Sequence, residues 1–385
     1  MSLSSRREYL GVMRGRYRAA KLRGERSQIL DEVVIATGFN RKYAIRVLSH
    51  PPMHKQSIHR RRPKHYREAL PAVQLIWEAL DYPCAERLHP VLLTTAELLH
   101  RHGELPLIDL VRDQLQRMSR ATLARRLVDL PTPKVRRAAL RSRPAPGIQA
   151  AVPIGRYAWD ETRPGALEID LVEHNGGSSA GHFAYTLDVV DIVTGWSARR
   201  AVLGRGQAGI FAALQWIVER WPFPIWALHS DNGSEFINAF LLQFCQQHGY
   251  EFSRSRPYKK NDNAHVEQKN RQFVREVVGY ARYDTPEQLA WLNQVYECLD
   301  PYANLYLPSR KITGKTRQGA HVRKTYDTAQ TPFQRALAAE ILDPATVASL
   351  QTQLQAHSPL ALHRDLEQLL SRPHPDPLLL TTAAD

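Results

Sequence analysis

The pattern of apolar residues changes at residue 166, and this change constrains the fold more than any other feature of the chain. Residues 166–172 alternate apolar and acidic side chains as half-buried strands do, and strand-like runs follow at 182–190 and 197–203. The later segments alternate helical and strand-like patterns: 206–221, 225–230, 234–248, 252–254 and a long helix from residue 263. Three strands in succession predict a meander, and the alternation after them predicts a layered α/β domain with a mixed sheet.

The first 60 residues contain a helical pattern, a turn with Gly38, and a second helix over residues 41–49. This order is the outline of a helix-turn-helix, and Asn40 is placed to cap the second helix. We expect three basic side chains of that helix to face phosphates or base edges: Arg41, Lys42 and Arg46.

A second helix pair is predicted near residue 119. Residues 107–118 are helical in pattern, Ser119 is a good N-cap, and residues 120–130 form the next helix. Arg120 and Arg125 on this helix are predicted DNA contacts. Two such units in tandem would bind a longer site than one.

Positive charge is concentrated in the first part of the chain. Residues 1–150 hold 29 Lys and Arg against 13 Asp and Glu, whereas the remainder holds 23 against 25. A block this basic predicts a polyanion-binding surface, with nucleic acid as the partner. The alternative is a solvated basic face without a partner.

A stretch rich in Pro and Arg separates the helical part from the α/β part and predicts an interdomain linker. A second basic segment, residues 308–324, contains no acidic residue, and residues 333–370 are helical in pattern. The predicted regions are a helix-turn-helix region, a second helical region, the linker, the α/β domain, a basic extension and a helical tail: 1–62, 63–130, 131–156, 157–285, 286–335 and 336–385.

Three carboxylates lie in or beside apolar segments, where acidic residues are uncommon unless they have a structural or functional role. Asp170 lies inside an apolar strand, Asp231 ends another apolar strand, and Glu267 borders the apolar stripe of the long helix. Taken singly, each has a structural explanation as a buried ion-pair partner, a helix cap or a solvated residue. Taken together, three carboxylates from three elements predict one site.

The spacing of these residues identifies a family resemblance. Asp231 and Glu267 are separated by 35 residues, 232–266. Over roughly residues 160–285 the chain resembles the DDE transposases of bacterial insertion sequences and the retroviral integrases. The motifs that carry the resemblance are Glu168-Ile169-Asp170-Leu171-Val172, His229-Ser230-Asp231-Asn232-Gly233-Ser234-Glu235-Phe236 and Asn261-Asp262-Asn263-Ala264-His265-Val266-Glu267-Gln268-Lys269-Asn270.

The resemblance implies a ribonuclease-H-like, mixed-sheet catalytic core preceded by all-α helix-turn-helix DNA-binding domains. It implies that Asp170, Asp231 and Glu267 are both the catalytic residues and the metal ligands. Carboxylates suit two Mg²⁺ ions, for which Mn²⁺ should substitute. The family pattern gives Glu168 and Asp188 no ligand role. We expect no zinc, because only Cys84 is available to complete a site with the N-terminal histidines.

Basic residues around the acidic motifs are predicted to form a rim that contacts DNA. Arg271 stands four residues after Glu267, the position at which integrases carry a basic residue that contacts the DNA end. The other predicted members of the rim are Lys259, Lys260, Lys269 and Arg275. A surface charge cluster without a ligand is the alternative for any one of them.

The remaining sequence features concern where in the cell the protein is located. Three isolated cysteines fit a reducing environment, residues 1–10 lack the apolar stretch of a signal peptide, and no apolar run is long enough to span a membrane. We therefore expect a cytoplasmic protein associated with the bacterial nucleoid.

The hypothesis from the sequence is a DNA transposase. It would bind the terminal inverted repeats of an insertion sequence, cut a strand and join the freed 3′-OH to target DNA, as a homo-oligomer that holds two DNA ends. Two alternatives stay open: a hydrolytic nuclease of the same fold, and a DNA-binding repressor derived from a transposase.

Overall fold

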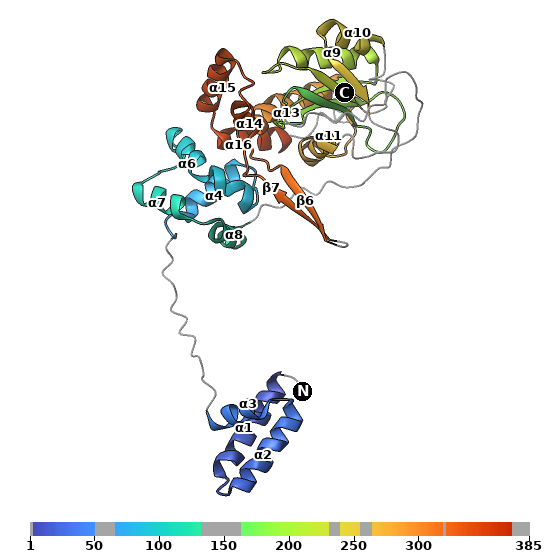
Figure 1. Cartoon of the computed structure of the whole chain (residues 1–385). Helices are drawn as coiled ribbons and strands as arrows, with labels where there is room; N and C mark the ends of the chain where they lie inside the picture. The colour runs from blue at the N-terminus through green and yellow to red at the C-terminus, as the bar shows by residue number, and fades with distance from the viewer. Residues whose placement is uncertain are drawn as a thin grey trace, which may run out of the picture. The chain divides into compact units, whose positions relative to one another are not determined.

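The computed structural model describes residues 3–50, 66–131, 163–230, 239–254, 264–318 and 321–371 (Figure 1). The chain divides into two compact units, residues 1–64 and residues 65–385. Within the described residues no helix is long and apolar enough to cross a membrane.

The described part of the first unit is a three-helix arrangement around a small core. Its helices are α1 (Leu3–Ala19), α2 (Arg23–Thr37) and α3 (Arg41–Ser49). Met13, Val33 and Leu48, one from each helix, are almost completely buried and pack together. The sequence did not predict α1, whereas the two helices around Gly38 are present as expected.

The turn between α2 and α3 is built from the residues that its geometry requires. Gly38 follows α2 with a φ of 71°, in the left-handed region that glycine adopts readily. The side chain of Asn40 then accepts a hydrogen bond from the Lys42 backbone N–H at 2.9 Å, which confirms the predicted cap of α3.

The second unit begins with helices that pack on the C-terminal part of the chain. They are α4 (Leu70–Ala79), α5 (Ala85–Leu88), the 3-10 helix η1 (His89–Val91), α6 (Leu92–Arg101), α7 (Asp109–Arg117) and α8 (Arg120–Asp129). Ser119 caps α8 as predicted, accepting from the Thr122 N–H at 3.2 Å. The hydroxyl of Tyr302 donates to the Ala79 carbonyl at 3.0 Å, and these helices share one hydrophobic core with the sheet.

A five-stranded mixed sheet forms the centre of the second unit. Its strands are β1 (Ala166–Glu173), β2 (Ala184–Asp191), β3 (Ser197–Leu203), β4 (Ala227–Ser230) and β5 (Glu251–Arg254). The order is β3-β2-β1-β4-β5, in which β1, β2 and β3 form an antiparallel meander, and β4 and β5 run parallel to β1. This confirms the predicted meander and mixed sheet.

Helices cover both faces of this sheet (Figure 1). One face carries α9 (Gln207–Glu219) and α10 (Ala239–His248). The other faces a helical run and the long helix after it: α11 (Ala264–Lys269), the π-helix η2 (Asn270–Arg275), α12 (Glu276–Val278) and α13 (Pro286–Leu305).

Helix α13 completes the hydrogen bonding of the edge strand β3. Three side chains of the helix accept from alternate backbone N–H groups of the strand: Asn304 from Ser197 at 3.0 Å, Asp300 from Arg199 at 2.8 Å and Asn293 from Ala201 at 2.9 Å. The amides of Asn304 and Asn293 donate back to the Ser197 and Ala201 carbonyls. Alternate backbone groups of an edge strand are normally open to pairing, and here helix side chains occupy them.

The basic segment that follows α13 folds as a β-hairpin. The sequence predicted the charge of this segment but not its strands. Strand β6 (Ile312–Gln318) pairs antiparallel with β7 (His321–Tyr326). Arg317, Arg323 and Lys324 are exposed on it. Three helices then end the described chain, as expected from residues 333–370: α14 (Pro332–Ala338), α15 (Pro344–Ala356) and α16 (Pro359–Ser371).

Candidate active site

One face of the sheet is polar at its centre. Residues two apart on a strand share a face, and so do residues paired across strands. Glu168 pairs with His229 of β4, and Asp170 pairs with Asp188 of β2. Continuing to the outer strands, the polar set is Glu168, Asp170, Asp188, Arg199, His229 and Ser253. All of them are buried except Asp170, which is half-buried.

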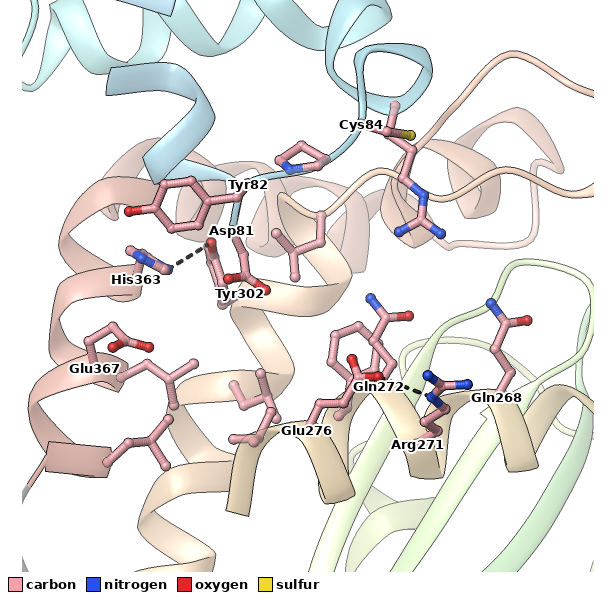
Figure 2. A pocket seen from close by; sticks show the side chains of 18 residues that line it. Asp81, Tyr82, Cys84, Gln268, Arg271, Gln272, Glu276, Tyr302, His363 and Glu367 are labelled. Carbon is pink, nitrogen blue, oxygen red and sulfur yellow. Dashed lines mark hydrogen bonds and ion pairs between the residues drawn. The ribbon is translucent and has the colours of Figure 1, made fainter. Parts of the chain in front are cut away.

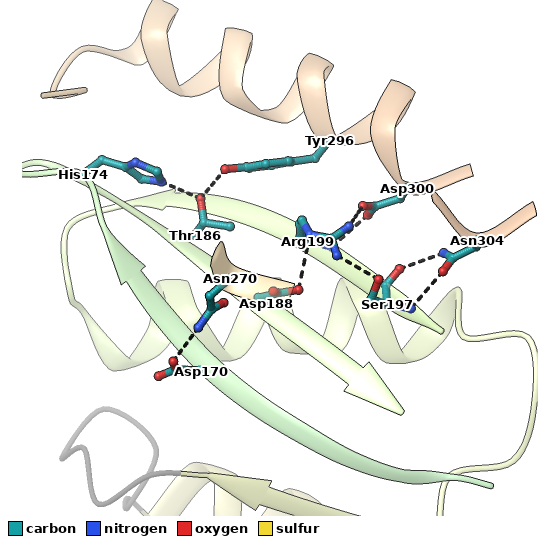
Figure 3. A network of polar contacts seen from close by, with 10 residues as sticks. All are labelled: Asp170, His174, Thr186, Asp188, Ser197, Arg199, Asn270, Tyr296, Asp300 and Asn304. Carbon is teal, nitrogen blue, oxygen red and sulfur yellow. Dashed lines mark hydrogen bonds and ion pairs between the residues drawn. The ribbon is translucent and has the colours of Figure 1, made fainter. Parts of the chain in front are cut away.

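The helix that carries Glu267 is held against this face by two hydrogen bonds. The backbone N–H of Val266 donates to Glu168 Oε2 at 2.9 Å, and Asn270 Nδ2 donates to Asp170 Oδ2 at 2.6 Å (Figure 3). Glu267 lies between these two contacts, and its side chain is exposed. The structure therefore brings the elements that bear Asp170 and Glu267 together.

The third predicted carboxylate, Asp231, lies outside the described residues. The residue before it is Ser230, the last residue of β4, which pairs in parallel register with Ile169, the residue before Asp170. The last residue of β4, Ser230, therefore lies beside the residue that precedes Asp170 on β1.

The residues at this edge suit a hard divalent cation. Within the described ranges, no group of three or more His, Cys, Asp or Glu is arranged to hold a metal ion, and the predicted set includes Asp231 from outside them. Asp170 and Glu267 supply carboxylate oxygens on adjoining elements, and such oxygens are the ligands that Mg²⁺ prefers. The carboxylates of Asp170 and Glu267 are therefore chemically suited to Mg²⁺.

A buried charge cluster adjoins Asp170 on the sheet. The Arg199 guanidinium is fully buried, donates to Asp300 Oδ1 at 2.5 Å and to Ser197 Oγ at 2.8 Å, and lies 3.4 Å from Asp188 Oδ1 (Figure 3). Neither carboxylate oxygen of Asp188 accepts a hydrogen bond from any residue that the structure describes. Burial therefore raises the pKa of Asp188 to about 7, against the opposing effect of Arg199, and raises that of Asp300 to about 6.

This cluster predicts a specific dependence of stability on pH. The pKa of Asp188 is 3.8 when unperturbed and about 7 in the folded protein, so between about pH 4 and pH 7 the folded state keeps a proton that the unfolded state loses. The contribution of Asp188 to the free energy of unfolding therefore falls as pH rises through that range. We expect the stability of Asp188→Asn, relative to the wild type, to increase from pH 4 to pH 7 in urea unfolding. Parallel stability profiles for the two proteins would contradict this.

Lys269, a predicted DNA contact, is half-buried and its ammonium lies 4.8 Å from the ring centroid of Phe273. The guanidinium of Arg199 lies 4.7 Å from the same centroid. Burial lowers the pKa of Lys269 to about 7, and Arg199 acts in the same direction. The structure thus places Lys269 beside the buried charge cluster.

The other predicted DNA contacts are mostly exposed. Arg41 forms an ion pair with Asp31, Arg46 stacks 4.9 Å over the Tyr43 ring, and Lys42 is exposed on the same helix. Arg120 and Arg125 are exposed on α8. Lys259 and Lys260 lie outside the described residues.

Near Glu267, Arg275 is half-buried with its guanidinium 4.7 Å from the Tyr280 ring centroid. Arg271 borders a pocket of about 620 Å³ between η2, α13, α16 and the turn after α4 (Figure 2). Its Nε donates to Glu276 at 3.1 Å.

In the turn after α4, Asp81 and Tyr82 both have positive φ, 59° and 53°, a conformation that is uncommon for residues other than glycine.

Two groups of site residues were missed by the sequence analysis. Glu168 and Asp188 were left without a role, although both are acidic residues inside apolar strands, the same signal that singled out Asp170. The partners Asp300 and Asn304 gave no signal, because they face the sheet from a helix about 100 residues away. Two histidines of these strands and their flanks also lie inside the fold: His174 bonds to Thr186 Oγ1 at 2.7 Å and His229 to Ser253 Oγ at 2.8 Å.

Comparison with known proteins gives one extensive match. The chain is 39% identical over 342 residues to the "Uncharacterized protein y4rM" of Sinorhizobium fredii (strain NBRC 101917 / NGR234), which covers 87% of this chain and 96% of that protein. No protein-family model matches the chain. Among solved structures, the catalytic core domain of BIV integrase aligns with 16% identity and a TM-score of 0.29, over 46% of this chain and 95% of that one.

Proposed function

We propose that this chain, which belongs to the same family as protein y4rM of Sinorhizobium fredii, is a DNA transposase that cuts and joins DNA strands with Asp170, Asp231 and Glu267. The observation that carries the proposal is the pair of hydrogen bonds that fix the helix of Glu267 over the strand of Asp170. These bonds hold the strand of Asp170 and the helix of Glu267 side by side, as a site built from both residues requires.

The proposed reaction is displacement at phosphorus. Water attacks a phosphodiester and the bond to the 3′ oxygen breaks, which frees a 3′-OH. That hydroxyl then attacks a phosphodiester of target DNA and displaces its 3′ oxygen, so one bond is formed for each bond broken. Two Mg²⁺ ions, or Mn²⁺, held by the three carboxylates would neutralise charge on the attacking and leaving oxygens.

The residues of this chain have positioning roles in that scheme. Asn270 fixes one oxygen of Asp170, which sets the direction of the other. Arg271 and Arg275 follow on the same helical run, where cationic side chains suit the phosphates of an incoming DNA end. We propose Lys259, Lys260 and Lys269 for the same rim.

The proposal includes a partner surface on each unit. In the first unit α3 would enter the DNA groove, and in the second Arg120 and Arg125 of α8 would contact the repeat further along. The exposed cations of the β6–β7 hairpin suit target or element DNA. A homo-oligomer follows from the need to hold two DNA ends, and the nucleoid is the corresponding location.

Strand joining is the experiment that tests this function. The purified chain would be incubated with a pre-cut duplex of the element end and supercoiled plasmid, in Mg²⁺, Mn²⁺ or EDTA. Joining that requires a divalent metal supports a transposase. Cutting without joining would favour a hydrolytic nuclease, and binding with neither reaction under every metal condition would favour a repressor.

DNA binding by α3 gives a separate prediction. Lys42→Ala and Arg46→Ala should each weaken binding to a duplex of the element end and reduce the slope of log affinity against log salt by about 1, because each removes a phosphate contact. Fluorescence anisotropy at several salt concentrations measures both quantities. Lys21→Ala, which removes the same charge from the turn before α2, is the matched control. Equal losses in all three variants would argue against α3 as the contacting helix.

A further inference from the structure

Glu168 is a buried carboxylate, 3% exposed, two residues before Asp170 on the same face of β1. Nothing in the proposed reaction uses it. Its Oε2 accepts a hydrogen bond from the backbone N–H of Val266, which precedes Glu267 and is 98 residues away in sequence.

The partner of Glu168 is a backbone N–H group of the helix that carries Glu267. Val266 is the third residue of α11 as described, and residues 255–263 before this helix lie outside the described part of the chain. The hydrogen bond is buried, and losing the acceptor of a buried N–H group costs free energy.

The two contacts, Glu168 with Val266 and Asp170 with Asn270, are spaced similarly on the strand and on the helix. Glu168 and Asp170 are two residues apart on a strand, which is about 6.6 Å. Val266 and Asn270 are four residues apart on the helix, which is about 6 Å. The two elements therefore run alongside each other with similar intervals, and Glu267 lies between the two contact residues of the helix in sequence.

We propose that Glu168 is a positioning residue: it fixes the first turn of α11 on β1 and thereby sets the place of Glu267 relative to Asp170. It acts through its acceptor oxygen and is neither a metal ligand nor a proton carrier. The inference rests on the proposed function for its effect on joining, whereas the contact with Val266 can be tested without it.

Two substitutions of Glu168 distinguish the effect of its hydrogen-bond acceptor from the effect of its negative charge. Glu168→Gln keeps an oxygen of the same reach that can accept from Val266, and Glu168→Leu removes it at similar volume. Glu173 provides the matched control, since it is a half-buried carboxylate on the same strand whose Oε2 accepts from Asn175 in the following loop. Far-UV circular dichroism establishes that each variant is folded.

The first readout is hydrogen exchange by mass spectrometry in the absence of DNA and metal. Peptides covering residues 264–269 should exchange about tenfold faster or more in Glu168→Leu, close to the wild-type rate in Glu168→Gln, and at the wild-type rate in Glu173→Leu. Wild-type protection of this helix in a folded Glu168→Leu would overturn the proposal whatever reaction the protein catalyses.

The second readout is strand joining with a pre-cut duplex. Glu168→Leu should lose about 100-fold, because small misplacements of a catalytic group have effects of this size. Glu168→Gln should stay within about tenfold of the wild type, since a neutral acceptor makes a weaker bond than a carboxylate. A Glu168→Gln variant as inactive as Asp170→Asn, with normal exchange protection, would show that the charge matters and would refute the positioning role. If no variant joins DNA, wild type included, the proposed function fails and the exchange data alone decide the role of Glu168.

Discussion

Asp170→Asn is expected to lower metal-dependent strand joining by about 10³-fold or more while leaving affinity for the DNA end within about twofold of the wild type. The substitution keeps the shape of the side chain, and its amide oxygen can still accept from Asn270 Nδ2, which now bonds Asp170 at 2.6 Å. The variant therefore loses the negative charge and a carboxylate ligand with little disturbance of the fold. The rate of joining a pre-cut duplex to plasmid, with binding measured in parallel, checks both parts.

Two further variants sharpen this test. Glu267→Gln should have a similar effect, because its carboxylate is assigned to the same metal site. Glu287→Gln, an exposed glutamate in the first turn of α13, removes the same charge away from the site and should join at the wild-type rate. Undiminished joining by Asp170→Asn would remove Asp170 from the mechanism and with it the proposed site.

Arg199→Met is expected to lower the free energy of unfolding of the second unit by about 3–5 kcal/mol. The fully buried guanidinium bonds to Asp300 and lies 3.4 Å from Asp188, so its removal takes away the side-chain donor to Asp300 and a cation beside Asp188. Urea unfolding followed by tryptophan fluorescence measures the loss. All seven tryptophans lie beyond residue 64, so the signal reports on this unit alone.

The neighbouring residue supplies the control. Arg200 also reaches a carboxylate of α13, Glu297 at 3.2 Å, but both of these side chains are partly exposed to solvent. Arg200→Met should therefore cost less than about 1 kcal/mol. Equal losses for the two arginines would show that burial does not set the strength of the cluster. Adding Asp300→Asn to Arg199→Met should recover part of the loss, since it replaces a buried carboxyl group that has lost its guanidinium partner.

The sequence predicted the elements of the sheet well because their signals are local. The strand expected at 166–172 differs from β1 by one residue at its end, and the strand expected at 197–203 coincides with β3. The predicted strand at 182–190 is β2 shifted by two residues at its start. Helix boundaries with a capping residue, such as Asn40 and Ser119, were equally predictable.

What could not be predicted depends on register and on distant packing. That Asp188 faces both Asp170 and Arg199 follows from how three strands align, and no single strand encodes this. The contact of Glu168 with Val266 joins residues 98 apart in sequence. The hairpin β6–β7 was missed because its strands carry mostly Lys, Arg, Thr and Gln, with no alternating apolar face to reveal them.

The side chains of α13 that occupy the edge of β3 also restrict how copies of this chain can assemble. Asn293, Asp300 and Asn304 take the backbone positions that an added strand would use, so a second molecule cannot extend the sheet from that side. Edge-to-edge pairing is a common route to domain swapping and to amyloid-like aggregation. A helix thus takes the place of a sixth strand and protects this edge in every copy, so any assembly of copies has to be built through other surfaces.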